Sequence, residues 1–145
     1  MDLSCELCRE PGGELLWQSE HCRIIRVADP AYPGFCRVIW RDHVREMTDL
    51  SPADRQMLME IVFIVESVMK TCFQPDKINL AAFGNMVPHL HWHIIPRWRE
   101  DKHFPEPIWG KVARPEARPV VPDVPSTMLA ARLKGALADA GYGAC

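Results

Sequence analysis

Three histidines separated by single residues are the first group in this sequence that could do chemistry. His89, His91 and His93 alternate with the apolar Leu90 and Trp92, and such alternation predicts a half-buried strand whose polar residues share one face. Neutral imidazoles could together bind a metal ion, or one could act as a nucleophile while its neighbours donate hydrogen bonds to an anion. A solvated sheet face is the alternative without chemistry, and three histidines in register disfavour it.

A Cys-x-x-Cys motif near the N-terminus is the second candidate group. The spacing of Cys5 and Cys8 is that of a tight turn that directs two thiolates at one zinc ion, which needs two further ligands from elsewhere. Two ordinary cysteines are the alternative, and a redox motif is disfavoured because no strand precedes the pair. The six cysteines form no dense framework, so we expect reduced thiols or ligands.

The elements that must position these groups follow from the apolar pattern. The histidine segment is expected to form a strand over 86–95, ended by Pro96 and joined to the preceding strand by a turn at Gly84-Asn85. The other expected strands cover residues 14–18, 22–27, 35–40 and 77–83. We therefore predict an α+β chain with an antiparallel sheet of about five strands, one long helix and a short C-terminal helix.

The long helix is expected to begin at Ser51-Pro52 and to end before Pro75. Its segment from Ile61 to Val65 is apolar all round, which indicates burial on more than one side. A two-fold homodimer would supply the second cover. The alternative is that the C-terminal segment of the same chain covers this face.

The chain changes character after Arg97. Seven of its thirteen prolines fall between Pro96 and Pro125, which predicts an irregular segment. We expect residues 1–100 to form one domain, and residues 101–145 to form a tail with a short helix beginning at Ser126, packed on the domain or its partner as an appendage. The segment from His103 to Trp109 could lie over the site or over a partner subunit.

Composition narrows the range of partners. The chain has 145 residues, a formal charge of −2 and a pI of about 6.3, so no basic field indicates nucleic-acid binding. It has no apolar run of membrane-spanning length and no basic-plus-apolar leader. We expect a cytoplasmic protein that binds neither nucleic acid nor membrane.

The histidine segment resembles the signature of the histidine-triad (HIT) superfamily, His-x-His-x-His-x-x, here followed by Pro96-Arg97. The resemblance implies the HIT fold and a nucleotide hydrolase or nucleotidyl transferase that acts at an α-phosphate, with dinucleoside polyphosphates or nucleoside phosphoramidates as candidate substrates. It implies that His91 attacks phosphorus, that the His89 carbonyl orients His91, and that His93 stabilises charge on the α-phosphate.

The same resemblance suggests binding residues. Relatives join the Cys-x-x-Cys pair with two histidines around structural zinc, which implies Cys5, Cys8, His43 and His89 as ligands. Nucleotide contacts are expected from Gly84, Asn85, Asn79 and Asp29, and the base pocket is expected from the first hairpin and the third strand. No catalytic metal is expected, because no two-carboxylate site is apparent.

Two residues of this chain depart from the pattern of its relatives and leave other functions open. Many relatives have Ser or Thr where this chain has Met86, and several have histidine where it has Phe35. A HIT dimer that binds nucleotide as a sensor or partner-binding module, with little catalysis, is therefore the main alternative. A metal-dependent β-barrel enzyme, with the three histidines on one catalytic metal, is a further hypothesis, although the long helix argues against it.

Overall fold

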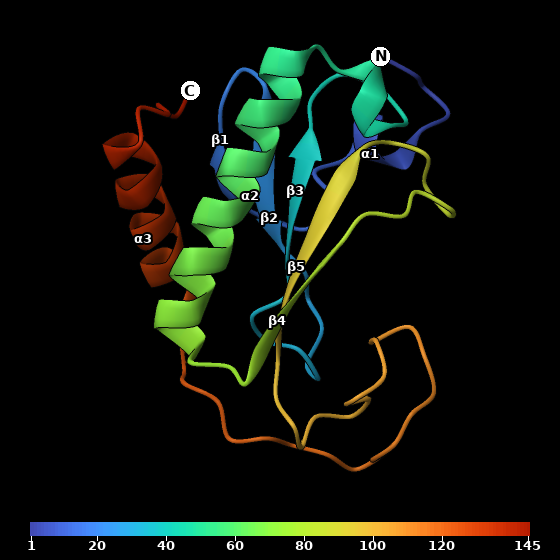
Figure 1. The fold of residues 1–145 in the computed structure, drawn as a ribbon, viewed down its shortest axis with the longest axis vertical. Helices are drawn as coiled ribbons and strands as arrows, with labels where there is room; N and C mark the ends of the chain where they lie inside the picture. The colour runs from blue at the N-terminus through green and yellow to red at the C-terminus, as the bar shows by residue number, and fades with distance from the viewer.

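The protein is built on one antiparallel sheet (Figure 1), and the computed structural model describes all 145 residues. The spatial strand order is β1-β2-β3-β5-β4, and every neighbouring pair is antiparallel. The strands are β1 (Glu14–Gln18), β2 (Cys22–Arg26), β3 (Cys36–Trp40), β4 (Lys77–Ala81) and β5 (His91–Arg97). The helices are α1 (Glu6–Arg9), α2 (Pro52–Phe73), α3 (Ser126–Asp139) and a 3-10 turn, η1 (Met47–Asp49). The predicted α+β class and five-stranded sheet are confirmed.

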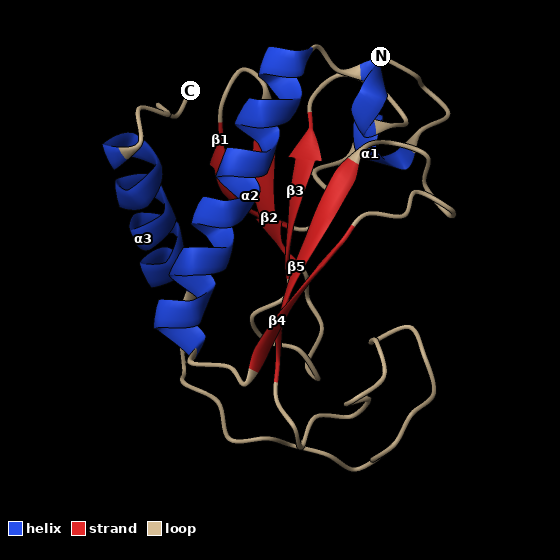
Figure 2. Ribbon diagram, viewed as in Figure 1, coloured by secondary structure: helices blue, strands red, loops and turns tan.

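The long helix α2 has the boundaries that its end signals predict. The Ser51 hydroxyl accepts a hydrogen bond from the Asp54 backbone N–H at 3.1 Å, which satisfies one of the free donors of the first turn. The helix ends at Gln74, whose φ of 48° is left-handed, directly before Pro75. One face of α2 lies on the sheet (Figure 2).

The second cover of α2 comes from α3 of the same chain. Leu129, Leu133 and Leu137 are fully buried and belong to the main core cluster, together with residues of α2 and the sheet. Burial of each such side chain stabilises the fold by roughly 1.5–3 kcal/mol. The C-terminal helix therefore packs on the domain of its own chain and contributes to the core, which is one of the two placements expected from the sequence. The domain division at residue 100 stays a prediction.

The histidine strand differs from its expected bounds. β5 begins at His91 and continues through Pro96 to Arg97, and the connection from β4 is a nine-residue segment, 82–90, instead of a two-residue turn. Pairing with β3 ends at Ile94, so β5 has a free edge on that side at Pro96, where a missing N–H is tolerated.

The segment after β5 loops out from the sheet before it returns to α3, as the orange part of the chain shows (Figure 1). Its first turn is fixed by Arg97 and Asp101, which are almost fully buried and paired through contacts of 2.8 and 3.0 Å.

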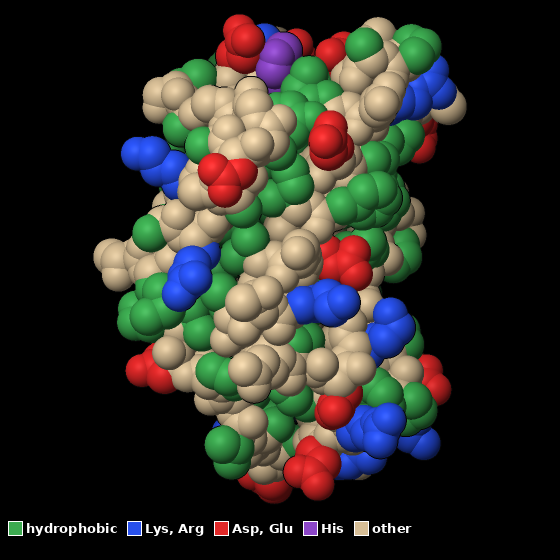
Figure 3. Space-filling model, turned by 60° about the vertical axis from the view of Figure 1, so that its left-hand side comes forward, with side chains coloured by type: hydrophobic (Ala, Val, Ile, Leu, Met, Phe, Trp, Pro, Cys, Tyr) green, Lys and Arg blue, Asp and Glu red, His purple; other side chains and the backbone are tan.

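The exposed face over the helices carries interspersed acidic and basic side chains (Figure 3). No helix combines the length and apolar character that a membrane crossing requires.

Candidate active site and metal site

The histidine motif divides between two sites. Alternation along β5 places His91 and His93 on the sheet face opposite α2, with ring centroids 4.8 Å apart. Leu90 and Ile94 belong to the core cluster on the helix side, and Trp92 packs against it, as predicted. His89 precedes the strand, is fully buried, and turns its ring towards Cys5 and Cys8. The expectation that three imidazoles emerge side by side therefore holds for two of them.

His91 is held as a neutral ring with a free lone pair. Its Nδ1 lies 2.5 Å from the His89 carbonyl oxygen, which can only accept a hydrogen bond, so Nδ1 carries the proton and Nε2 does not. Burial lowers the pKa of His91, the hydrogen bond to His89 raises it, and the charge of Arg37 lowers it further. A neutral imidazole with an unprotonated Nε2 can attack an electrophile.

His93 is held in the opposite orientation. Arg37 Nε donates to His93 Nδ1 at 3.4 Å, which leaves the ring proton on Nε2 as a donor. Burial, the neighbouring His91 and the charge of Arg37 lower the pKa of His93 to about 3, so the ring is neutral near pH 7. Side by side, the site offers one nitrogen lone pair and one N–H group.

Arg37 was missed by reasoning from sequence. It pairs with His93 across β3 and β5 and therefore shares its face. The sequence contained a signal, because Arg37 is the single charged residue in the apolar strand Cys36–Trp40. Burying a charge in such a strand is costly unless the charge is paired or hydrogen-bonded.

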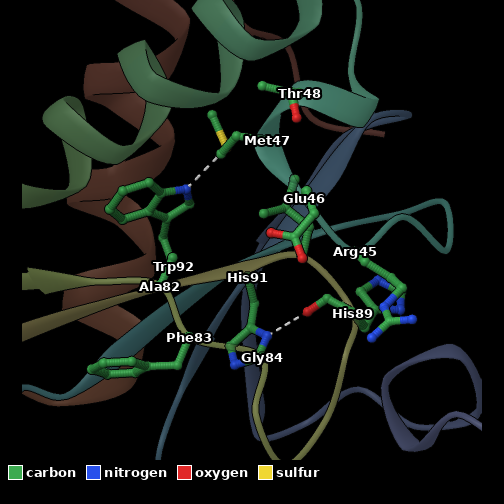
Figure 4. A pocket seen from close by; sticks show the side chains of 11 residues that line it. Arg45, Glu46, Met47, Thr48, Ala82, Phe83, Gly84, His89, His91 and Trp92 are labelled. Carbon is green, nitrogen blue, oxygen red and sulfur yellow. Dashed lines mark hydrogen bonds between the residues drawn. The ribbon is translucent and has the colours of Figure 1, made fainter.

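An open pocket of about 320 Å³ lies beside His91 (Figure 4). One wall comes from residues 45–48, and another comes from Ala82, Phe83 and Gly84. Trp92 closes one side and donates from Nε1 to the Met47 sulfur at 3.4 Å. Gly84 has a φ of +77°, which favours glycine. The pocket gives a ligand access to the mostly buried His91 ring.

The predicted nucleotide contacts are dispersed. Gly84 lines the pocket, whereas Asn85 is exposed and does not. Asn79 shares the histidine face and accepts a hydrogen bond from Arg97 at 2.7 Å. Asp29 lies in a separate hollow, where its carboxylate accepts from the Ala31 backbone N–H at 2.9 Å. Their roles as nucleotide contacts stay predictions.

The four predicted metal ligands come together. Ligand atoms of Cys5, Cys8, His43 and His89 all lie within 4.8 Å of one another. The three sulfur–nitrogen contacts among them are each 3.5 Å. A tetrahedral ion with the usual Zn–S and Zn–N bond lengths separates such atoms by about 3.6 Å. The donor set and its spacing fit a closed tetrahedral metal site.

The second ring nitrogens of the two histidine ligands are also engaged. His89 Nε2 donates to the Trp40 carbonyl at 2.7 Å, which leaves Nδ1 unprotonated towards the cysteines. His43 Nε2 lies 3.7 Å from an Asp2 carboxylate oxygen. A carbonyl partner such as that of Trp40 orients histidine ligands in metalloproteins, whereas the longer contact between His43 and Asp2 is electrostatic only. The group includes only one member of the triad, and the sheet is open, so the hypothesis of a β-barrel enzyme with a three-histidine metal was wrong.

The segment after β5 lies over the site. Trp109 packs against His93 with ring centroids 4.9 Å apart, and against Phe83 at the same distance. Of the two placements expected for the segment from His103 to Trp109, over the site or over a partner subunit, the monomer shows the first. Sequence reasoning had no means of choosing, because the placement depends on the buried Arg97–Asp101 pair.

Comparison with known proteins gives a consistent result. Residues 9–100 match the family described as HIT domain. The chain is 30% identical over 93 residues to an AP-4-A phosphorylase of Mycobacterium tuberculosis, covering 60% of this chain and 48% of that protein. It is 27% identical over 92 residues to a bis(5'-adenosyl)-triphosphatase of Saccharomyces cerevisiae, covering 59% and 45%. The chain thus spans about half the length of these curated relatives.

Solved structures extend the likeness over most of the chain. A histidine triad protein from Marinobacter aquaeolei superposes with a TM-score of 0.69 at 30% identity, covering 89% of this chain and 91% of that one. A histidine triad protein from Sinorhizobium meliloti gives a TM-score of 0.69 at 27% identity, with coverage of 88% and 91%.

Proposed function

This chain belongs to the HIT domain family, and on that premise we propose that it is a nucleotide hydrolase or nucleotidyl transferase. It acts at the α-phosphate of a dinucleoside polyphosphate or a nucleoside phosphoramidate through a covalent nucleotidyl-His91 intermediate. The names of the relatives from Mycobacterium tuberculosis and Saccharomyces cerevisiae support dinucleoside polyphosphates as the substrate class.

The observation that carries the proposal is the complementary protonation of two adjacent rings. The Nε2 lone pair of His91 attacks the α-phosphorus, a P–N bond forms, and the bond from phosphorus to the leaving group breaks with its electron pair on the leaving group. The Nδ1–H group of His91 continues to donate a hydrogen bond to the His89 carbonyl oxygen. This hydrogen bond stabilises the positive charge that develops on the ring. His93 Nε2–H donates to a phosphate oxygen.

The second step releases the nucleotide. A water oxygen attacks the same phosphorus, the P–N bond breaks with its electron pair returning to His91 Nε2, and the water proton leaves with solvent or product. Inorganic phosphate in place of water makes the reaction a phosphorolysis. The pocket beside His91 admits either acceptor.

We further propose that the metal is zinc, held by Cys5, Cys8, His43 and His89. A closed site with four protein ligands supplies structural stabilisation and leaves no open position for substrate. Its contribution to the reaction is indirect, because it fixes the ring of His89 while the backbone of the same residue orients His91.

Two further proposals concern assembly and compartment. Phe63 on α2 is 54% exposed, and an exposed aromatic ring within the apolar run from Ile61 to Val65 supports a homodimer. Thiols suited to a metal site support a reducing compartment, the cytoplasm.

A nucleotide-binding module with little turnover is the second candidate. It is favoured by Met86, whose side chain is 95% exposed and supplies no hydroxyl to a phosphate, and by Phe35, whose ring lies 5.7 Å from that of His93. A dimer of this kind would act as a sensor or hold a partner.

Substitution of the proposed nucleophile tests the function. His91→Ala is expected to reduce turnover of a dinucleoside tetraphosphate by at least about 10³-fold, with nucleotide affinity, measured by calorimetry, within a few-fold of wild type. His21→Ala is the matched control, because His21 is only partly buried and lies outside the site. Rapid-quench mass spectrometry should find a nucleotidyl adduct on His91. Turnover that survives in His91→Ala refutes the mechanism, and tight binding without adduct or turnover supports the binding module.

A further inference from the structure

Two exposed aromatic side chains stand beside His93. Phe83 and Trp109 are 57% and 50% exposed, and their ring centroids lie 4.9 Å apart at an interplanar angle of 80°. The Phe83 ring also lies 6.2 Å from the His93 ring. Neither residue belongs to a core cluster. The packing of the fold therefore does not account for this pair.

Trp109 is held in place by the arm 98–114, the segment that follows β5. Arg97 Nη2 donates to the Glu106 carbonyl at 2.8 Å, and Arg114 donates to the Phe104 carbonyl at 2.7 Å. Ile108, next to Trp109, packs against the cluster of Tyr32, Phe35 and Ile95. Most of the arm lies beyond residue 100, where the HIT domain match ends. The indole is thus positioned before any ligand arrives.

The two sides of the histidine row differ. β3 and β2 lie on one side of β5, where Cys5, Leu7, Ile25 and Ile39 form a buried apolar cluster with the partly buried Val27 beside it. β4 lies on the other side, and Phe83 comes two residues after its last residue, Ala81. Displacement at phosphorus places the entering and leaving groups roughly in line. A substrate whose attacked nucleoside lies towards β2 and β3 therefore directs its leaving group to the opposite side.

The chemistry on the leaving-group side suits a nucleotide. Aromatic faces stack nucleobases. Arg37 reaches His93 from the β3 side, at the reacting centre, and takes part in none of the ion pairs of the structure. A guanidinium without a carboxylate partner is a ready contact for phosphate oxygens. A cation at the reacting histidines and an aromatic pair on the β4 side match an α-phosphate whose leaving group ends in a base.

We propose that Phe83 and Trp109 form a subsite for the base of the departing nucleotide of a dinucleoside polyphosphate. This inference rests on the proposed function. The subsite gives the enzyme a preference for substrates with two nucleosides over those with one. It assigns the arm 98–114 a role in substrate selection.

A binding experiment on the full chain separates the two bases. Calorimetry is run with a diadenosine tetraphosphate whose two α,β-bridging oxygens are replaced by methylene groups, which resists cleavage at either α-phosphorus, and with AMP, which carries only the attacked nucleotide. Trp109→Ala is expected to weaken binding of the bridged dinucleotide by about 5- to 100-fold and to leave AMP binding within twofold. Trp109→Phe should restore most of the affinity. Val120→Ala, at a position 98% exposed, is the control and should change neither.

Kinetics then distinguish failure of the subsite from failure of the proposed function. With diadenosine tetraphosphate, Trp109→Ala should raise KM by a similar factor, whereas kcat/KM for adenosine phosphoramidate, whose leaving group has no base, should stay within twofold. Equal losses on both substrates, equal weakening of both ligands, or no change on the dinucleotide overturns the subsite while leaving the proposed reaction intact. If wild type cleaves neither substrate but the binding difference holds, the subsite stands and the proposed reaction falls.

Discussion

Replacing Asp101 by Asn should destabilise the protein more than any change of similar size on its surface. Asp101 is fully buried and receives two hydrogen bonds from Arg97, at 2.8 and 3.0 Å. The backbone N–H groups of Trp98, His103 and Phe104 also donate to its carboxylate. Asn keeps the shape and removes the charge, so the Arg97 guanidinium remains buried without its counter-ion.

The expected loss follows from the burial of the pair. Removing one partner of a buried ion pair costs about 3–5 kcal/mol, and the amide oxygen that Asn retains places the expected value near the lower end. Urea unfolding followed by circular dichroism at pH 7 should therefore show a free energy of unfolding about 3 kcal/mol lower for Asp101→Asn. Glu116→Gln, an exposed carboxylate in the same segment, should change it by less than about 0.5 kcal/mol.

The pH dependence gives a second measurement. Burial raises the pKa of Asp101, but hydrogen bonds from Arg97 and the three backbone N–H groups outweigh it and lower the pKa to about 2. The folded pKa lies below the unfolded value of about 3.9, so the charge stabilises the fold fully above that value and progressively less as pH falls towards 2. The difference between wild type and Asp101→Asn should shrink by about 1 kcal/mol between pH 5 and pH 3.

Two results would refute this reasoning. One is a loss below 1 kcal/mol at pH 7, and the other is a difference between the two proteins that does not change with pH. Hydrogen exchange should also quicken over residues 98–114 in Asp101→Asn, because the same carboxylate holds the start of the arm that positions Trp109. Unchanged exchange there would show that the arm is anchored elsewhere.

Two further predictions concern the site. Cys8→Ser should abolish stoichiometric metal binding, measured by elemental analysis, and lower Tm, whereas Cys145→Ser, at the exposed C-terminus, should do neither; metal retained by Cys8→Ser would contradict the four-ligand site. Arg37→Met should lower kcat by about tenfold or more, because His93 loses the partner that keeps its proton on Nε2; the same loss appearing only in KM would show that Arg37 binds substrate without orienting His93.

Local sequence signals predicted the elements well. Ser51 and Pro52 start α2, the alternation at Leu90, Trp92 and Ile94 separates the two sheet faces, and the Cys-x-x-Cys spacing marked half of the metal group. Each of these depends on neighbours in the chain, so the pattern contains the information. The end of β5 was misjudged because tolerance of Pro96 depends on where β3 stops pairing, which no local pattern records.

The parts of the site that were missed depend on contacts between distant segments. Arg37 acquires its role only through cross-strand pairing with His93. Trp109 reaches the site because Asp101, buried beside Tyr32, fixes the direction of the arm. His89 is separated from the other two histidines because it precedes the first residue of β5, and its ring contacts Cys5, Cys8 and the Trp40 carbonyl instead of facing the pocket.

The acceptors that set the proton positions on His89 and His91 are main-chain oxygens, those of Trp40 and of His89 itself. Every amino acid supplies such an oxygen, so no single codon change can delete either acceptor. Activity should therefore be sensitive to mutations at the residues that fix the backbone conformation between residues 87 and 91, namely Pro88 and the four-ligand cluster. Mutations that abolish activity in such proteins should occur at the four-ligand cluster as often as at the nucleophile.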